Sequence, residues 1–249
     1  MTPAESPLAG WRILITRPAE QIAPFAGALS AAGAVAISYP TIRLAPPESW
    51  QPLDQALADS NGYDWAVFTS PSAVRFTLNR AGVSSFKTMK LAAVGTETAR
   101  ALTSFGLIAD VVPPDDEQRQ EGLVQALAAL GRGTRVLFPQ TVGGRELLKD
   151  RLVGQGCRVD IVPVSRTVAV KPSAPPPPFD VATFASPSAL RAFVDAWGAG
   201  ALAGKIVAAI GPTTAAAAAE AHVKVGVMPA RPSIPTLIDA LIAYRATLG

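Results

Sequence analysis

The stretch from Asp64 to Val74 reads DWAVFTSPSAV, and the stretch from Asp180 to Leu190 reads DVATFASPSAL. Each places a short apolar run before a Ser-Pro-Ser turn, a pattern typical of a buried strand that leads into a helix. The two turns are 116 residues apart, as Ser70 and Ser186 show. The same turn at two places predicts two copies of one strand-turn-helix unit.

The same offset holds farther along the chain. Leu91–Leu102 reads LAAVGTETARAL and Val207–Ala218 reads VAAIGPTTAAAA, again 116 residues apart. A third match pairs Pro113 with Pro229 at this offset. Similarity at one fixed offset indicates a repeated structural unit rather than chance resemblance.

A second register relates two other segments. Ile13–Pro18 reads ILITRP and Val136–Thr141 reads VLFPQT, with 123 residues between Leu14 and Leu137. The middle of the chain runs through all the repeated segments without a break, whereas the two ends supply them in two parts. We therefore predict a discontinuous α/β domain at residues 1–40 plus 172–249 and a continuous α/β domain at residues 45–166. The two crossings between them are predicted at residues 41–44 and 167–180.

The second crossing is rich in proline. Lys171–Pro178 reads KPSAPPPP, and such a tract forms an extended, semi-rigid connector rather than a helix. Because the chain crosses twice, we expect a two-stranded hinge between the domains.

Within each copy, short apolar runs alternate with helical patterns. Ala66–Phe68, Leu91–Val94 and Arg135–Phe138 are predicted to be strands buried on both faces, and Glu146–Leu152 an amphipathic helix. Strands that alternate with helices indicate a parallel sheet covered by helices. The fold class is therefore α/β, with two flavodoxin-like parallel-sheet domains of about five strands each joined by a two-stranded hinge.

Composition narrows the class of protein. The chain has 249 residues, of which 49% are hydrophobic and 16% charged, with a formal net charge of +3. The only cysteine, Cys157, and the only histidine, His222, leave no disulfide framework and no multi-histidine metal site. Without a signal peptide or a long apolar run, we expect a soluble cytoplasmic protein.

Ligands of open α/β sheets bind beyond the carboxyl ends of the strands. Four turns rich in serine and threonine are predicted at these strand ends, over residues 69–72, 95–98, 185–188 and 211–214. Each turn begins a helix, and a helix N-terminus favours carboxylate or phosphate groups. Ordinary helix capping explains any single turn equally well. Their recurrence in both domains favours a ligand site in the cleft where the helix ends face each other. Arg17 follows a strand end and is a candidate for anion binding.

Three other features favour structural roles. Cys157 is expected to be a small buried apolar residue. His222 follows an alanine-rich helix and is expected near its end rather than in catalysis. Asp115–Glu117 is expected to be a solvated loop.

The motifs ILITRP, SPSA and GxxTA together resemble those of the uroporphyrinogen-III synthase family, and the form PTTA at Pro212–Ala215 is the most specific of them. The resemblance spans Arg12–Leu241 and includes the divided order of the repeat. It implies a lyase of tetrapyrrole (haem, sirohaem or cobalamin) synthesis that cyclises hydroxymethylbilane to uroporphyrinogen III, with loss of water and inversion of ring D.

The resemblance also implies what the protein binds. The substrate is an anionic linear tetrapyrrole, and no cofactor or metal is used. A monomer is expected, with a transient contact with hydroxymethylbilane synthase and no nucleic-acid or membrane partner. Catalysis would come mainly from holding a flexible chain in one conformation.

The family motifs are carried over to this sequence position by position. This sequence differs from the family pattern at two positions, where Ser165 replaces a tyrosine and Gln140 replaces an arginine. Helix-end donors that stabilise the departing hydroxide would compensate for the tyrosine. The expected catalytic residues are Thr98, Ser165 and Thr214. The expected substrate-binding residues are Arg17, Ser70, Ser72, Thr96, Ser186, Ser188 and Thr213.

Three alternatives remain at this point. The two missing side chains suit a non-catalytic tetrapyrrole-binding or regulatory homologue on the same fold. A hinged solute-binding protein is disfavoured by the missing signal peptide. A flavodoxin-like electron carrier would be yellow when purified.

Overall fold

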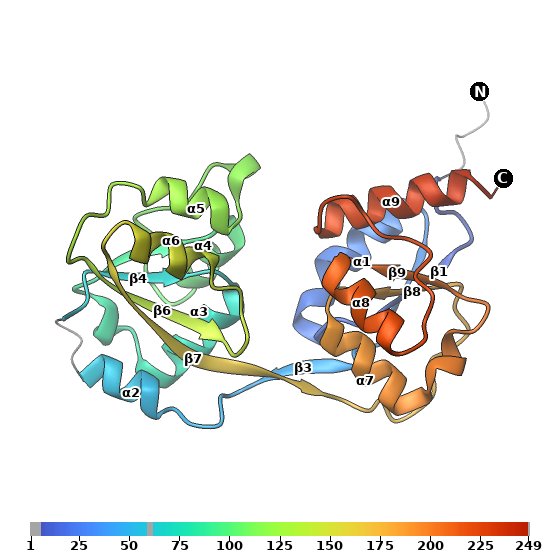
Figure 1. The fold of residues 1–249 in the computed structure, drawn as a ribbon, viewed down its shortest axis with the longest axis horizontal. Helices are drawn as coiled ribbons and strands as arrows, with labels where there is room; N and C mark the ends of the chain where they lie inside the picture. Colours follow the sequence, from blue (N-terminus) through green and yellow to red (C-terminus); the bar gives the residue numbers. More distant parts are fainter. Residues whose placement is uncertain (1–5, 59–61, 249) are drawn as a thin grey trace. The chain divides into compact units, whose positions relative to one another are not determined.

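The computed structural model describes residues 6–58 and 62–248 and divides the chain into two compact units. Unit 1 comprises the residues up to Leu44 together with those from Thr167 onward, and unit 2 comprises Ala45–Arg166. In Figure 1 the orange and red elements belong to unit 1 and the green elements to unit 2. One unit is thus assembled from both parts of the chain that flank the other.

Unit 1 is built on a four-stranded sheet in the order β2-β1-β8-β9. All three strand pairs are parallel, so the strands share one carboxyl edge. The strands are β1 (Arg12–Ile15), β2 (Val35–Ser38), β8 (Val181–Phe184) and β9 (Ile206–Ala209). The helices are α1 (Ile22–Ala31), α7 (Pro187–Trp197), α8 (Pro212–Glu220) and α9 (Ile234–Ala246).

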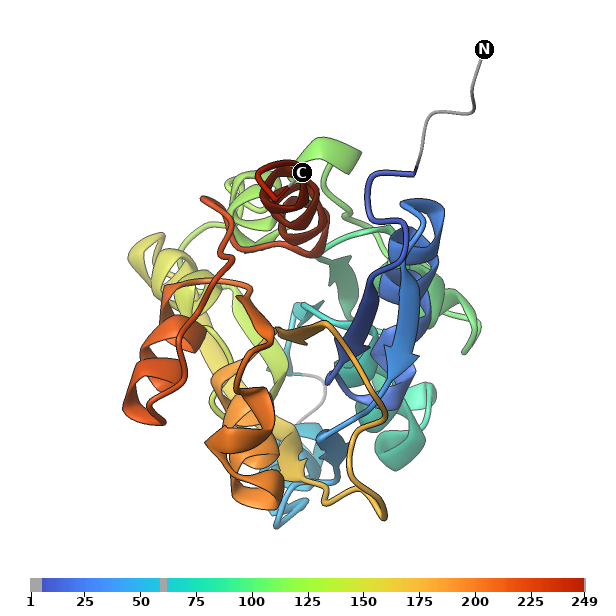
Figure 2. The ribbon, with the colours of Figure 1, turned by 90° about the vertical axis from the view of Figure 1, so that its right-hand side faces the viewer.

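Alternating side chains of β1 point to opposite faces of this sheet, as strand geometry requires. Ile13 and Ile15 pack in the core beneath α1 and α9, whereas Leu14 packs in the core beneath α7 and α8. Figure 2 shows α1 (blue) on one side of the strands and α7 and α8 (orange) on the other. A strand buried on both faces explains why β1 reads as an apolar run.

The other sheet has the order β3-β7-β6-β4-β5 and lies mainly in unit 2, although most of β3 and the end of β7 belong to unit 1. The pairs β7–β6, β6–β4 and β4–β5 are parallel. The strands are β3 (Ile42–Ala45), β4 (Trp65–Phe68), β5 (Lys90–Ala93), β6 (Arg135–Thr141) and β7 (Arg158–Ala169). The helices are α2 (Gln51–Ala58), α3 (Pro71–Ala81), α4 (Thr96–Thr103), α5 (Gln120–Ala126) and α6 (Leu147–Gly154).

The faces of this second sheet are covered in the same way. Ala66 and Phe68 of β4 pack in the core with α2, α3 and α4, and Trp65 and Val67 pack in the core with α5 and α6. The predicted strands and the predicted helix over 146–152 are all present, with ends shifted by at most three residues. Because β4, β5 and β6 are parallel, the helices that follow them begin at one edge of this sheet.

The two registers read from the sequence recur in the strand pairing. Arg12 pairs with Val35 and Arg135 with Arg158, each partner 123 residues from its counterpart. Isolated bridges join Ala92 to Val111 and Ala208 to Val227, each again displaced by 116. The repeat is therefore a structural duplication, and each position in one unit has a defined counterpart in the other.

The crossings between units are strands rather than loops. β3 and β7 are hydrogen-bonded neighbours in the sheet, and both unit boundaries fall inside these strands. The backbone N–H of Val170 also donates to the carbonyl of Thr41, at 2.7 Å. Lys171–Pro178 forms neither helix nor strand.

Smaller expectations have mixed outcomes. Cys157 is buried in the core beneath α5 and α6, and His222 lies two residues beyond α8, both as expected. Asp115–Glu117 is not a plain loop but a single 3₁₀ turn, because hydrogen bonds within this segment close it. Across residues 6–58 and 62–248, no helix is long and apolar enough to cross a membrane.

Candidate functional site

Four turns rich in serine, threonine and glycine lie where parallel strands end and helices begin. The β4–α3 and β5–α4 turns belong to unit 2, and the β8–α7 and β9–α8 turns belong to unit 1. The first turn of each helix presents N–H groups that have no acceptor within the helix. Each unit thus carries two potential anion-binding turns at the carboxyl edge of its sheet.

The two Ser-Pro-Ser turns have nearly the same geometry. The Oγ atoms of Ser70 and Ser186 each accept a hydrogen bond from the backbone N–H three residues on, at 3.1 and 3.2 Å. Both serines therefore cap their helices, although each hydroxyl can still donate its own hydrogen. Of the second serines of these turns, Ser72 is buried and Ser188 is exposed.

The two turns led by glycine have no cap of their own, because Gly95 and Gly211 carry no side chain. Their second threonines, Thr98 and Thr214, are almost fully buried, with exposed fractions of 2% and 1%. The surroundings of these two turns nevertheless differ.

In unit 2 the glutamine side chain of Gln118 fills the α4 turn. Its Oε1 accepts from the backbone N–H of Thr96 at 2.9 Å, and its Nε2 donates to Thr96 Oγ1 at 2.7 Å and to Asp115 Oδ1 at 2.6 Å. The fit is close, since a Cβ on Gly95 would lie 2.5 Å from Gln118 Oε1. The anion-binding position of α4 is therefore already occupied by an amide of the same unit.

In unit 1 the α8 turn has no such amide. Ile234 is the counterpart of Gln118, and the ring of Pro232 packs against Gly211 instead. The Oγ1 atom of Thr214 is buried and has no hydrogen-bond partner among the described residues. A buried hydroxyl without a partner is costly, so this atom is suited to a ligand that supplies one. Thr213, beside it, is exposed.

Arg17 lies at the end of β1, in a cavity of about 160 Å³ within unit 1 that Ser186 also lines. The preceding residue, Thr16, donates its hydroxyl to the Thr183 carbonyl at 2.8 Å and so fixes this end of β1 against β8. Arg17 Nη2 donates to the neutral Oε1 of Gln21 at 2.7 Å. Across the described residues no carboxylate pairs with this guanidinium, and its burial lowers the pKa of Arg17. A half-buried cation without an anion is suited to bind a carboxylate.

The counterpart of Arg17 in unit 2 is Gln140, which is buried and turned inward. Its Nε2 donates to the backbone carbonyl of Arg145 at 2.8 Å. Beside it, the fully buried Ser165 shares a hydrogen bond of 2.8 Å with Thr141. The polar groups at this position of unit 2 are therefore bonded within the unit.

The carboxyl edges of the two sheets also differ in charge. Unit 2 has acidic Glu97 and Asp115 at positions where unit 1 has Thr213 and Arg231. Glu97 forms an ion pair with Arg100, one turn further along α4. Arg231 is exposed. Unit 1 thus presents the more positive edge to an anionic ligand.

Among the candidate residues, Arg17 and Ser186 line one cavity, and Thr213 and Thr214 share the α8 turn. Thr98 and Ser165 share no hydrogen bond in the described part of unit 2. Motif reasoning missed Gln118 because this residue lies 22 positions beyond Thr96 and gives no local signal in the sequence. It also missed Arg231, which a comparison of the two copies at the 116-residue offset would have found.

A family model described as uroporphyrinogen-III synthase HemD matches residues 23–239. The uroporphyrinogen-III synthase of Synechococcus elongatus is 41% identical over 165 residues, which cover 64% of this chain and 62% of that protein. The porphyrin biosynthesis protein HemD of Ruminiclostridium josui is 27% identical over 96% of this chain and 49% of that protein. The chain therefore spans less than two thirds of the length of these curated relatives.

Solved structures share the fold at low sequence identity. The uroporphyrinogen-III synthetase of Helicobacter pylori superposes with a TM-score of 0.60, at 16% identity, over 94% of this chain and 99% of that one. A mutant uroporphyrinogen III synthase of Thermus thermophilus gives a TM-score of 0.56, at 18% identity, over 96% of this chain and 100% of that one. These likenesses confirm the α/β fold class predicted from the sequence.

Proposed function

We propose, from the premise that this chain belongs to the uroporphyrinogen-III synthase family, that it converts hydroxymethylbilane to uroporphyrinogen III. The names of its relatives support the activity. The observation that carries the proposal is the open carboxyl edge of unit 1. Among the described residues, the Arg17 guanidinium has no anionic partner and the Thr214 hydroxyl has no hydrogen-bond partner, and a carboxylated substrate would supply both.

The proposed reaction is that of a carbon–oxygen hydro-lyase. The hydroxyl leaves the hydroxymethyl carbon of ring A as water, and the resulting azafulvene is attacked by the substituted carbon of ring D. The spiro intermediate then breaks and closes the macrocycle with ring D inverted. Spontaneous closure without this inversion competes, so the protein must hold the bilane in one conformation.

The residues of unit 1 are assigned to binding and to the departing hydroxyl. Arg17 and the first turn of α7, capped by Ser186, bind substrate carboxylates by charge-assisted hydrogen bonds. Thr213 adds an exposed hydroxyl, and Ser188 lies on the same helix as Ser186. Thr214 donates to the leaving oxygen and so stabilises the charge that develops there.

The residues of unit 2 are assigned supporting roles. Ser70, Ser72 and Thr96 contribute polar groups around the first turns of α3 and α4, and Thr98 lies one turn into α4. Ser165 remains a candidate catalytic residue. To act on the substrate, its hydroxyl has to exchange the hydrogen bond that it shares with Thr141.

Several properties of the family complete the proposal. We carry forward the expectation of a cofactor-independent enzyme that acts as a monomer in the cytoplasm. A transient contact with hydroxymethylbilane synthase would deliver the unstable bilane directly.

The test is an isomer assay. The purified protein is incubated with hydroxymethylbilane, the products are oxidised, and the uroporphyrin isomers are separated and compared with a reaction without protein. We expect mainly type III isomer. Type I isomer alone, with bilane retained by the protein, would favour a non-catalytic tetrapyrrole-binding homologue and overturn the proposal.

A further inference from the structure

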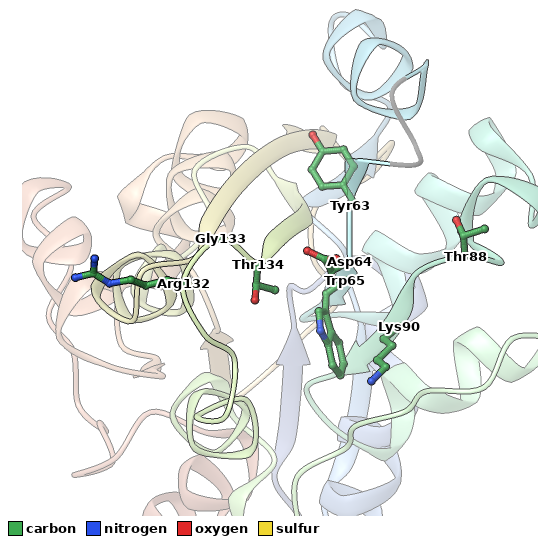
Figure 3. Close-up of a pocket in the computed structure, with 8 residues that line it drawn as sticks. All are labelled: Tyr63, Asp64, Trp65, Thr88, Lys90, Arg132, Gly133 and Thr134. Carbon is green, nitrogen blue, oxygen red and sulfur yellow. The ribbon is translucent and has the colours of Figure 1, made fainter.

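A large open pocket lies at the amino edge of the unit 2 sheet, the edge opposite the candidate site. Its volume is about 750 Å³, and its lining comes from the segments that precede or begin β4, β5 and β6. Figure 3 shows these side chains. The lining residues are Tyr63, Asp64, Trp65, Thr88, Lys90, Arg132, Gly133 and Thr134.

The duplicated fold provides an internal control for the chemistry of this pocket. At the counterpart positions in unit 1, Lys90 becomes Ile206, Trp65 becomes Val181 and Arg132 becomes Ala9. Unit 1 forms the same parallel strand pairs with these apolar or small residues. The cations and the indole of unit 2 are therefore not needed to build the sheet.

One lining residue does belong to the fold. Asp64 Oδ2 accepts from the backbone N–H of Arg135 at 2.8 Å, and in unit 1 Asp180 accepts from Arg12 in the same way, also at 2.8 Å. This carboxylate holds the start of the neighbouring strand in both units. Its presence in the pocket therefore has a structural explanation.

The remaining groups are mostly hydrogen-bond donors. Lys90 Nζ lies 5.6 Å from the centre of the Trp65 ring, and neither Lys90 nor Arg132 forms an ion pair among the described residues. The hydroxyls of Thr88 and Thr134 also have no hydrogen-bond partner in the described part of the chain. Two cations and two hydroxyls around one apolar ring are typical of a site for an anion.

The arrangement of the two cations indicates the shape of that anion. In Figure 3, Lys90 and Arg132 lie on opposite sides of the pocket, with Thr134 and Asp64 between them, and the Arg132 guanidinium points away from Thr134. Anionic groups at both ends of a ligand would each meet a cation once the exposed Arg132 side chain turns toward the pocket, while staying apart from the central Asp64 carboxylate. A single small oxyanion would reach only one cation.

We propose that this pocket is a second binding site, distinct from the carboxyl edge, for an anion that carries at least two separated oxyanion groups. Lys90 and Arg132 each bind one group, the threonine hydroxyls donate to either, and the Trp65 ring contacts the body of the ligand. The shared chemistry covers both oligophosphates and polycarboxylates.

The experiment titrates the purified protein with tripolyphosphate and, separately, with benzene-1,2,4,5-tetracarboxylate, followed by calorimetry and tryptophan fluorescence. We expect saturable binding of at least one probe, and the stronger one identifies the class of oxyanion. Lys90→Gln and Arg132→Gln should each weaken that binding by about tenfold, and the loss should shrink as salt concentration rises. Both side chains are exposed, so the variants are expected to fold normally.

Two control variants locate the binding. Lys205→Gln removes a cation that lies 5.3 Å from the Phe179 ring at the amino edge of unit 1, and Arg17→Gln removes the candidate site on the other edge. Lys205→Gln should not change the affinity, and Arg17→Gln should remove at most a separate binding event at the carboxyl edge. The proposal is overturned if neither probe binds saturably, or if Lys90→Gln and Arg132→Gln both leave the saturable binding unchanged.

Discussion

The two units share strand order, turns and helices, yet they differ in the polar groups left free at their carboxyl edges. In unit 2, Gln118 caps α4, Gln140 bonds to a backbone carbonyl and Ser165 bonds to Thr141. In unit 1, Arg17 has one neutral partner and Thr214 Oγ1 has none among the described residues. A duplicated scaffold thus supplies the same helix ends twice, and side chains decide which of them remain available.

This difference changes how much each donor can contribute to the free energy of ligand binding. A donor that is already bonded must break that bond before it can bind a ligand, so its net contribution to affinity is small. A donor that is buried without a partner gains the whole interaction. We therefore expect substitutions at the unit 1 edge to affect activity, and substitutions at the unit 2 edge to affect stability.

The largest effect on activity is expected at Arg17, whose counterpart in unit 2 is Gln140. Arg17→Gln gives unit 1 the residue of unit 2 and removes a charge-assisted hydrogen bond, so KM for hydroxymethylbilane should rise by about 10- to 100-fold. Gln140→Arg places a guanidinium at a buried position beside Gly144, so it should lower stability while changing KM by less than about threefold. Steady-state kinetics with Arg151→Gln, on the outer helix α6, as the control would check this, and equal KM values for Arg17→Gln and wild type would contradict the assignment.

The next effect separates the two buried threonines. Thr214→Val keeps the side-chain volume but removes the hydroxyl, and we expect turnover to fall by about tenfold. Thr98→Val should lower turnover less. Because the Thr214 hydroxyl has no hydrogen-bond partner within residues 6–58 and 62–248, its loss should leave stability unchanged or higher. Equal turnover losses in the two variants, or a marked destabilisation by Thr214→Val, would show that both threonines serve the fold alone.

A smaller effect is expected from the amide that fills the α4 turn. Gln118→Ala removes three hydrogen bonds around Thr96 and should lower the free energy of unfolding of unit 2 by about 1 kcal/mol, with KM nearly unchanged. Urea unfolding measures this, with the exposed Gln125→Ala as the matched control. A midpoint equal to that of the control would argue against the cap.

The smallest effect contrasts Tyr63 with its counterpart Phe179. Burial, followed by the hydrogen bond to Asp160, raises the pKa of Tyr63 to about 12, above the value of about 10 in an unfolded chain. The resulting stability is fully present below pH ~10 and is lost as pH rises toward ~12. Tyr63→Phe should cost less than about 1 kcal/mol at pH ~8 and flatten that alkaline decline.

Urea titrations at several alkaline pH values would reveal the change in slope. An identical pH dependence in Tyr63→Phe and wild type would mean that another group controls alkaline unfolding. Phe179 gives unit 1 no corresponding titration, so the effect should be confined to unit 2.

Much of the fold could be predicted from the sequence because the same order of apolar runs and turns occurs in both units. The runs at Ala66–Phe68 and Arg135–Phe138 are apolar at successive positions, which indicates strands covered on both faces. Fixed offsets then paired the segments without any knowledge of contacts. The strand pairing of β3 with β7 was less accessible, since an expected hinge carries no pattern that distinguishes strand from linker.

The helix starts at the candidate site were predicted from the sequence, whereas the hydrogen-bond partners of their side chains were not. Ser70 and Ser186 lie at the expected helix starts, and capping is indeed what their Oγ atoms do. Whether a hydroxyl is free depends on side chains that approach from elsewhere in the chain, as Gln118 does at Thr96 and Thr141 does at Ser165. Such contacts follow from tertiary packing and leave no local signature.

The divided construction of unit 1 also dictates an order of assembly during synthesis. All residues of unit 2 leave the ribosome while β1, which is already made, still lacks its partner β8, whose residues follow about 170 positions later. Until then β1 and β2 present an unpaired apolar edge of the kind that favours intermolecular association. The closure of so long a loop is slow, so unit 1 should be the last part of a nascent chain to resist proteolysis.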